Sequence, residues 1–286
     1  MKKYVMRKIK IGLLIALLSL VLSFTLERGY FYYNFYFGDG WQSAEDKMTG
    51  DYVVLLHGIR ASAGAMDNLA RHLGNAGYTV INIDYPSSTY NIETLVEEYI
   101  VPKFSAIPAD ENRRLHIVTH SMGGIVLREY LKTHVIKNLG KIVMIAPPNH
   151  GSEWSDFFAD WKIANWIMGP ALNELQMGKN GITEGLPEPT GDIGIIAGKN
   201  KWSLIGNILS NGDTDGKVSV ESTHLTRMTD FLLVREGHLS ILSSKEVMQA
   251  TEKFLKEGGF NRPSSSNNLS GFARSQWAST LWTREF

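Results

Sequence analysis

Residues 115–131 read LHIVTHSMGGIVLREYL, and this stretch decides the fold. The apolar run at 115–120 predicts a buried strand, and the residues after it carry apolar side chains at helical spacing. Ser121 therefore lies on a strand-to-helix turn, with its hydroxyl exposed above the sheet. Gly123 and Gly124 let the helix pass close to the strand, and N–H groups at the helix start can stabilise an oxyanion. The turn predicts a nucleophilic serine; the alternative is a serine that only caps the helix.

Strands and helices alternate along the chain between residues 52 and 257. Further buried strands are predicted at 52–58, 78–86, 141–148, 191–198 and 230–238, and helices at 64–75, 92–105, 123–137 and 245–257. Pro102 must kink or split the second of these helices. Continuous apolar strands joined by helices predict an α/β fold: a mostly parallel, twisted sheet of about six strands with helices on both faces.

The turn at Ser121 also carries a family resemblance. Residues 119–123 (THSMG) resemble the G-x-S-x-G nucleophile elbow of the α/β-hydrolase superfamily, with a threonine in place of the first glycine, where it adds bulk between helix and turn. The resemblance implies an oxyanion hole with one backbone N–H from Met122 and the other from Ile59 or Arg60. His57, just before that loop, is expected to buttress the turn rather than to take part in catalysis.

A serine nucleophile needs a base, normally a histidine, and a carboxylate that orients the base. Among the eight histidines, His238 follows the last strand, on a loop at the edge where active sites of parallel sheets lie. His150 follows the strand 141–148 and is a weaker candidate. The side chain of His120 is expected to point away from the serine. We therefore predict His238 as the base.

Two aspartates precede the last strand. The string at 215–218 (DGKV) resembles the D-G-x-V turn that presents the acid in lipases of the superfamily, which implies Asp215 as the acid and leaves Asp213 as the alternative. The order Ser121, Asp215, His238 matches the superfamily's order. Residues 211–216 also fit the start of a calcium-binding loop, but a serine stands at the twelfth position, where a bidentate glutamate is required. No metal is predicted.

The segment between the strands 141–148 and 191–198 is longer than a helical connection requires. It contains four aromatic side chains at helical spacing: Trp154, Phe157, Phe158 and Trp161. We expect a helical cap or lid at about 149–190. Its aromatic face either lines a pocket for acyl chains or packs on the sheet.

Composition limits the classes of function. The 286 residues include no cysteine, which excludes disulfides, thiolate metal sites and a cysteine nucleophile. The 29 basic residues balance 29 acidic ones, which argues against nucleic acid as a partner. Nothing in the sequence indicates a charged specificity pocket. We expect the protein to be a monomer.

The two ends of the chain differ from its centre. Five basic residues within 1–10 precede the uncharged run 11–26, a pattern typical of a secretory signal or signal anchor. We predict an anchor and interfacial segment at 1–37 and a linker at 38–51. The catalytic domain follows at 52–260, and a Ser/Asn-rich tail at 261–286. The protein is then expected in the cell envelope, membrane-anchored with an extracytoplasmic domain, or secreted if the signal is cleaved.

Together these features predict a serine hydrolase of carboxylic esters, lipase- or carboxylesterase-like, which acts on an ester or lipid through an acyl-enzyme on Ser121 and needs no cofactor. An acyltransferase with the same triad is the nearest alternative. A catalytically silent, membrane-anchored binding protein is the alternative from another class, and the threonine in the elbow is its only support.

Overall fold

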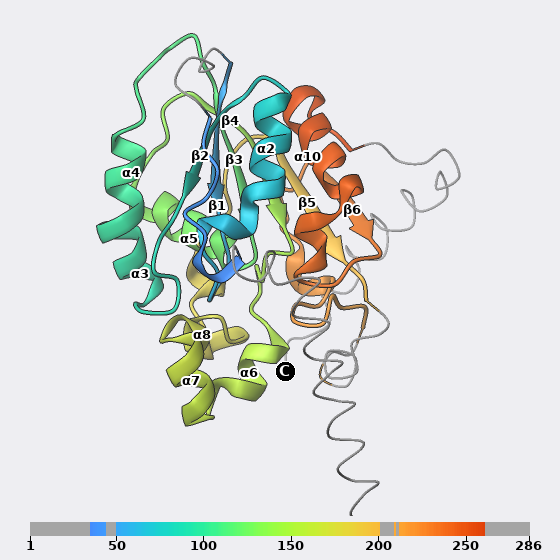
Figure 1. Cartoon of the computed structure of the whole chain (residues 1–286). Helices are drawn as coiled ribbons and strands as arrows, with labels where there is room; N and C mark the ends of the chain where they lie inside the picture. The colour runs from blue at the N-terminus through green and yellow to red at the C-terminus, as the bar shows by residue number, and fades with distance from the viewer. Residues whose placement is uncertain (1–34, 44–49, 201–208, 210–211, 261–286) are drawn as a thin grey trace, which may run out of the picture.

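A single parallel sheet forms the centre of the molecule. The computed structural model describes residues 35–43, 50–200, 209 and 212–260. The strand order is β2-β1-β3-β4-β5-β6, and every neighbouring pair is parallel (Figure 1). The strands are β1 (Tyr52–Leu56), β2 (Thr79–Ile83), β3 (Leu115–His120), β4 (Leu139–Ile145), β5 (Ile193–Gly198) and β6 (Asp230–Val234). The predicted fold class is confirmed.

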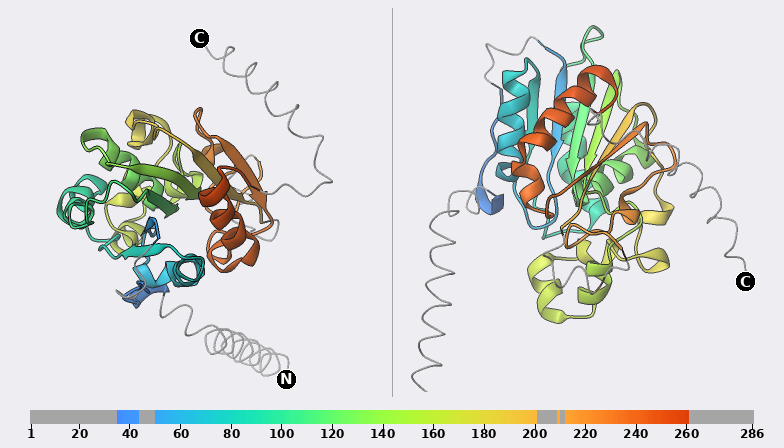
Figure 2. Two further views of the ribbon diagram at one scale, coloured as in Figure 1. Left: turned by 90° about the horizontal axis from the view of Figure 1, so that it is seen from above. Right: turned by 90° about the vertical axis from the view of Figure 1, so that its right-hand side faces the viewer.

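Helices cover both faces of this sheet, as the view from above shows (Figure 2). The helices α2 and α10 pack on one face, and α3, α4 and α5 pack on the other. Their bounds, with those of the short helical turns beside them, are η2 (Ala63–Met66), α2 (Asp67–Asn75), α3 (Ile92–Leu95), η3 (Val96–Ile100), α4 (Val101–Ser105), α5 (Met122–Thr133), η6 (Glu221–Thr223), η7 (Ser240–Ser243) and α10 (Lys245–Glu257).

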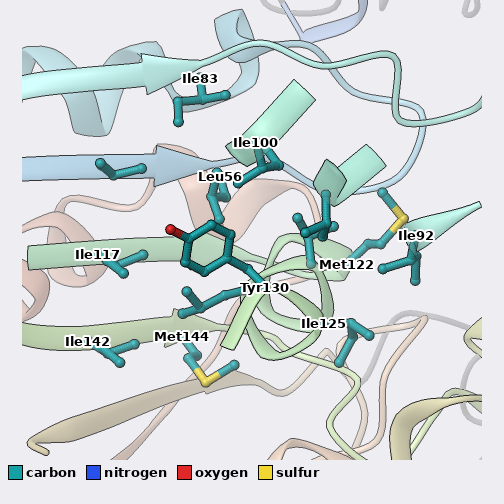
Figure 3. Packing of buried hydrophobic residues seen from close by; sticks show 14 of the residues in the cluster. Leu56, Ile83, Ile92, Ile100, Ile117, Met122, Ile125, Tyr130, Ile142 and Met144 are labelled. Atoms are coloured by element: carbon teal, nitrogen blue, oxygen red, sulfur yellow. The ribbon is translucent and has the colours of Figure 1, made fainter. Parts of the chain in front are cut away.

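The strands are buried on both faces, which explains why their sequences are continuously apolar rather than alternating. Val53 and Leu55 of β1 belong to the core under α2 and α10, whereas Val54 and Leu56 belong to the core under α5. In the core under α5, side chains of β1, β3 and β4 surround Tyr130 of α5 (Figure 3). The α5 helix is therefore fixed directly over the central strands.

Residues 92–105 form one continuous helical run through Pro102, and a π-helical turn takes the place of the predicted split. A single π-helical turn, Val96–Ile100, lies between α3 and α4, and Pro102 falls in the first turn of α4. Pro102 has no N–H to donate, and the wider π-helical turn directly before it accommodates the missing donor without ending the helical run.

The segment between β4 and β5 forms a helical layer at the carboxyl ends of the strands, at the bottom of Figure 1. It contains α6 (Glu153–Ala159), α7 (Lys162–Met168), α8 (Ala171–Glu174), η4 (Gly178–Asn180) and η5 (Thr183–Gly185). The buried guanidinium of Arg128 in α5 donates hydrogen bonds to the carbonyls of Asn149, Thr183, Leu186 and Pro187. Both ends of the layer are thereby joined to the domain.

Residues 35–43 pack on the domain as well. The N–H of Ser62 donates to the carbonyl of Phe35 (2.8 Å), and the N–H of Val80 donates to Oγ of Ser43 (2.9 Å). The first part of the expected linker therefore lies along β2 and the start of α2. Of the predicted anchor and interfacial segment at 1–37, the structure describes residues 35–37, and Phe35 among them is buried against the domain. The rest of that segment, 1–34, and the predicted tail, 261–286, lie outside the described residues. Within the described ranges, no helix has the length and apolar character needed to cross a bilayer.

Candidate active site

Ser121 occupies the turn between β3 and α5, as the sequence predicted. Its backbone has φ 52° and ψ −126°, a positive φ that non-glycine residues rarely adopt. Its N–H donates a hydrogen bond to the carbonyl of Ile145 in β4 (2.9 Å). A strained backbone of this kind persists only where the surrounding structure holds it, and such residues cluster at functional sites.

Two glycines make this turn possible. A Cβ on Gly123 would lie 2.4 Å from the carbonyl oxygen of Leu56, so only glycine lets α5 pass this close to β1. A Cβ on Gly124 would lie 3.3 Å from Oγ1 of Thr119, the residue that replaces the first glycine of the elbow. The crowding expected from this threonine is therefore relieved by the glycine that faces it.

His238 connects the serine to a carboxylate. Its Nε2 lies 2.9 Å from Oγ of Ser121, and its Nδ1 lies 2.7 Å from Oδ2 of Asp215. All three side chains are buried. With the carboxylate accepting the Nδ1 proton, Nε2 is left free to accept the proton of the serine hydroxyl. The structure thus brings together the three residues that the sequence singled out.

Asp215 is held by its own turn. Its Oδ1 accepts hydrogen bonds from the N–H groups of Lys217 and Val218, both at 2.9 Å. The N–H of His238 donates to its carbonyl (3.0 Å), which ties the acid loop to the loop that carries the base. The two bonds to Oδ1 are charge-assisted and stabilise the buried carboxylate.

The other candidates lie elsewhere. Asp213 forms an ion pair with Lys199 and does not contact His238. The two aspartates of the calcium-loop pattern thus have separate partners. Asn211, the first position of that pattern, is outside the described residues. His150 is exposed and does not line the pocket at Ser121.

His120 enters the site, although we expected its side chain to point away from the serine. Its Nε2–H donates to the carbonyl of His238 (2.9 Å), and the two rings lie 4.9 Å apart. Burial, with the nearby charge of protonated His238 as a smaller cause, holds the pKa of His120 well below its usual value, so this ring is neutral. His120 and His238 are 118 positions apart in the sequence, so no local pattern indicates that they are in contact.

His57 supports the opposite side of the turn, as expected. Its Nε2 accepts a hydrogen bond from the N–H of Tyr85 (3.3 Å), and its ring stacks on the Tyr85 ring at 4.0 Å. The Tyr85 hydroxyl donates to the His57 carbonyl. The end of β1, which leads into the next loop, is thereby fixed.

That loop, which carries the residues predicted to donate to an oxyanion, lies at the pocket. Gly58, Ile59 and Arg60 line the same pocket as Ser121. In the described chain, the N–H groups of Ile59 and Arg60 have no backbone acceptor. Met122 is the first residue of α5, where a helix leaves its N–H groups unpaired. Unpaired N–H groups near the nucleophile are what an oxyanion hole requires.

The pocket above Ser121 has a volume of about 240 Å³. Its lining is mostly apolar and aromatic, and it includes Phe35 and Tyr36 from the N-terminal segment. It also includes two cations, Arg60 and Lys217, and no carboxylate among the described residues. Nothing in the sequence indicated these charges, because the acid turn brings the Lys217 side chain to the cavity only in the folded structure.

Of the four aromatic residues of the expected cap face, the structure brings Trp154 to the pocket. Phe157, Phe158 and Trp161 contact one another, with the Phe158 ring edge-to-face against the other two. Phe157 and Trp161 are 45% and 53% exposed. The helix α6 ends at Ala159, so Trp161 lies beyond the helix and the spacing does not continue to the end of the pattern.

Comparisons with known proteins agree with this geometry. Residues 53–202 match the model of the alpha/beta hydrolase family. Similar solved structures include the mature lipase BlEst2 of Bacillus licheniformis (19% identity, 77% of this chain and 95% of that chain, TM-score 0.57). They also include phospholipase PlaB of Legionella pneumophila (16% identity, 74% of this chain and 60% of that chain, TM-score 0.58). A metagenomic carboxyl esterase is similar as well (17% identity, 76% of this chain and 75% of that chain, TM-score 0.55). At these identities the likeness is one of fold. No curated protein sequence matches the chain. From the family match, the sheet and the elbow at Ser121, we conclude that the chain belongs to the alpha/beta hydrolase family.

Proposed function

We propose that this protein is a serine hydrolase that cleaves carboxylic esters, lipase- or carboxylesterase-like. The observation that carries the proposal is the hydrogen-bonded series Ser121–His238–Asp215, at 2.9 Å and 2.7 Å, beneath a largely apolar pocket. The names of the similar structures, a lipase, a phospholipase and a carboxyl esterase, support an ester as the substrate.

The geometry accounts for each step of an acyl-enzyme mechanism. Nε2 of His238 takes the proton of Ser121 as Oγ bonds to the ester carbonyl carbon. The N–H groups of Met122 and of Ile59 or Arg60 stabilise the resulting oxyanion. His238 then protonates the departing alcohol, which leaves the acyl group on the serine. Water, deprotonated by the same histidine, releases the acid and restores the enzyme.

Two alternatives differ from this proposal in specific ways. An acyltransferase would use the same residues but replace water with an alcohol as the acyl acceptor. A catalytically silent binding protein was supported only by Thr119, and Gly124 accommodates that residue. We also propose that the basic and apolar run at 1–26, within the predicted segment 1–37, anchors an extracytoplasmic domain to the membrane, or directs its secretion if the run is cleaved. Phe35 and Tyr36, at the end of that segment, belong to the pocket instead.

A fluorophosphonate probe tests the nucleophile. We expect the probe to label the wild type and the Ser105→Ala control, because Ser105 is exposed at the end of α4, far along the chain from the elbow. Ser121→Ala should not be labelled. Absence of labelling in the wild type, or equal labelling of Ser121→Ala, contradicts the proposal. Product analysis with and without added alcohol then separates hydrolysis from acyl transfer.

A further inference from the structure

Lys217 presents a cation to the catalytic pocket from a fixed backbone. Its N–H donates to Oδ1 of Asp215 (2.9 Å), and its carbonyl accepts a hydrogen bond from Oγ of Ser152 (2.6 Å). Its Nζ lies 5.2 Å from the centroid of the Trp154 ring, which also lines the pocket. The turn that holds the acid thus also holds this ammonium beside Ser121.

Arg60 presents a second cation from the opposite loop. Its Nη1–H donates to the carbonyl of Ile167 in α7 (3.0 Å), and its guanidinium lies 5.6 Å from the centroid of the Tyr36 ring. Arg60 is exposed, and among the described residues its other guanidinium N–H groups have no acceptor. A guanidinium fork matches the oxygen atoms of carboxylates and phosphates.

No acid in the described part of the chain neutralises this pair. Neither Lys217 nor Arg60 forms an ion pair with a carboxylate there. Asp215 is the acid closest in sequence to Lys217, but its oxygens already accept hydrogen bonds from two N–H groups and from His238. Burial lowers the pKa of Lys217, and the nearby carboxylate of Asp215 only partly opposes that shift, so a further anion in the pocket would stabilise the ammonium.

We propose that Lys217 and Arg60 form a subsite for a carboxylate or phosphate group carried by the substrate, so that the enzyme prefers anionic esters to neutral ones. This inference rests on the proposed ester hydrolase function and assigns its substrate class. The apolar lining then receives the hydrocarbon part of the substrate, while the two cations receive its charged group.

Matched substrate pairs test the subsite. In the first pair, 4-nitrophenyl hydrogen glutarate carries a carboxylate on the acyl side, and its methyl ester is neutral. In the second pair, 1-butyrylglycerol 3-phosphate carries a phosphate on the alcohol side, and 1-butyrylglycerol is neutral. The measured quantity is the ratio of kcat/KM for the anionic ester to that for its neutral partner. We expect the wild type to prefer the anionic member of at least one pair about tenfold or more.

Variants show which residues cause the preference. Lys217→Met and Arg60→Gln should each lower the ratio about tenfold, and Lys217→Glu should reverse it. Lys199→Met is the matched control, because it also removes one positive charge but from a lysine that pairs with Asp213 outside the pocket lining. The control should keep the wild-type ratio.

The outcomes separate this inference from the proposed function. If wild type cleaves the neutral esters through Ser121 but shows ratios near one in both pairs, the ester hydrolase stands and the anion subsite is overturned. A ratio that Lys217→Met leaves unchanged, or that Lys199→Met lowers equally, also overturns the subsite. If no ester of either kind is cleaved, the proposed function fails, and the inference fails with it.

Discussion

The ring of His120 donates a hydrogen bond from Nε2 to the backbone carbonyl of His238 (2.9 Å), so a residue next to the nucleophile positions the loop of the base. We expect His120→Leu to destabilise the protein by about 1–3 kcal/mol and to lower kcat/KM, because a buried carbonyl loses its donor. His120→Gln can still donate from its amide and should recover part of both losses. Thermal unfolding and ester kinetics measure the effects; equal behaviour of the two variants would argue against positioning through this bond.

The same ring links stability to pH. The pKa of His120 is held well below 6.5 in the fold, mainly by burial, whereas the unfolded chain regains the usual value. Below pH 6.5 the unfolded state therefore binds a proton that the native state does not, so the free energy of unfolding decreases as pH falls, with a slope approaching about 1.4 kcal/mol per pH unit. We expect His120→Gln to reduce the slope in urea unfolding between pH 7 and 5. Burial also lowers the pKa of His116, so this residue still contributes to the pH dependence of the variant.

Two neighbouring aspartates allow a matched test of the acid. Asp215→Asn removes the charge that stabilises protonated His238 and should lower kcat by a factor on the order of 10⁴. Asp213→Asn only breaks an ion pair with Lys199 and should change kcat less than about twofold. Steady-state kinetics decide between them. A larger loss in the Asp213 variant would transfer the role of the acid to that residue.

The threonine of the elbow should respond to loss of its hydroxyl. Oγ1 of Thr119 is buried without a hydrogen-bond partner among the described residues, so Thr119→Val should raise the free energy of unfolding by about 1 kcal/mol. Thr79 is equally buried, but its hydroxyl donates to the carbonyl of Gly50 (3.3 Å), so Thr79→Val should lower stability. Chemical denaturation of both variants checks the contrast; destabilisation by Thr119→Val would show that its hydroxyl is satisfied.

The preference for anionic esters should depend on pH. Lys217 faces Arg60, Asp215 and neutral His120, and burial lowers its pKa from the usual 10.5. The ammonium therefore loses its proton at a pH where an exposed lysine keeps it, so the anionic-to-neutral ratio of kcat/KM should fall as pH rises towards 10. The positive charge of Arg60 also lowers this pKa, so Arg60→Gln should move the fall to higher pH. A ratio constant up to pH 10 would contradict the role of the ammonium.

Local patterns were sufficient for the elements and for the order of the three site residues. The predicted strand 115–120 and helix 245–257 agree with β3 and α10, because the first is a short apolar run with a clear end and the second has apolar side chains at helical spacing. The strand predicted at 52–58 ends two residues early, at Leu56, because His57 turns to bond with Tyr85 rather than to continue the ladder. Ends of this kind depend on partners outside the segment.

The sequence by itself therefore determined the parallel sheet, the turn at Ser121 and the three residues that meet there, because hydrophobic period and glycine spacing act within a few residues. Only the tertiary structure decided that His120 holds the base loop, that Lys217 and Arg60 charge the pocket, and that Trp154 alone of the cap aromatics lines it. The direction of a loop side chain depends on packing against segments far away in the sequence, and the local pattern contains no record of those segments.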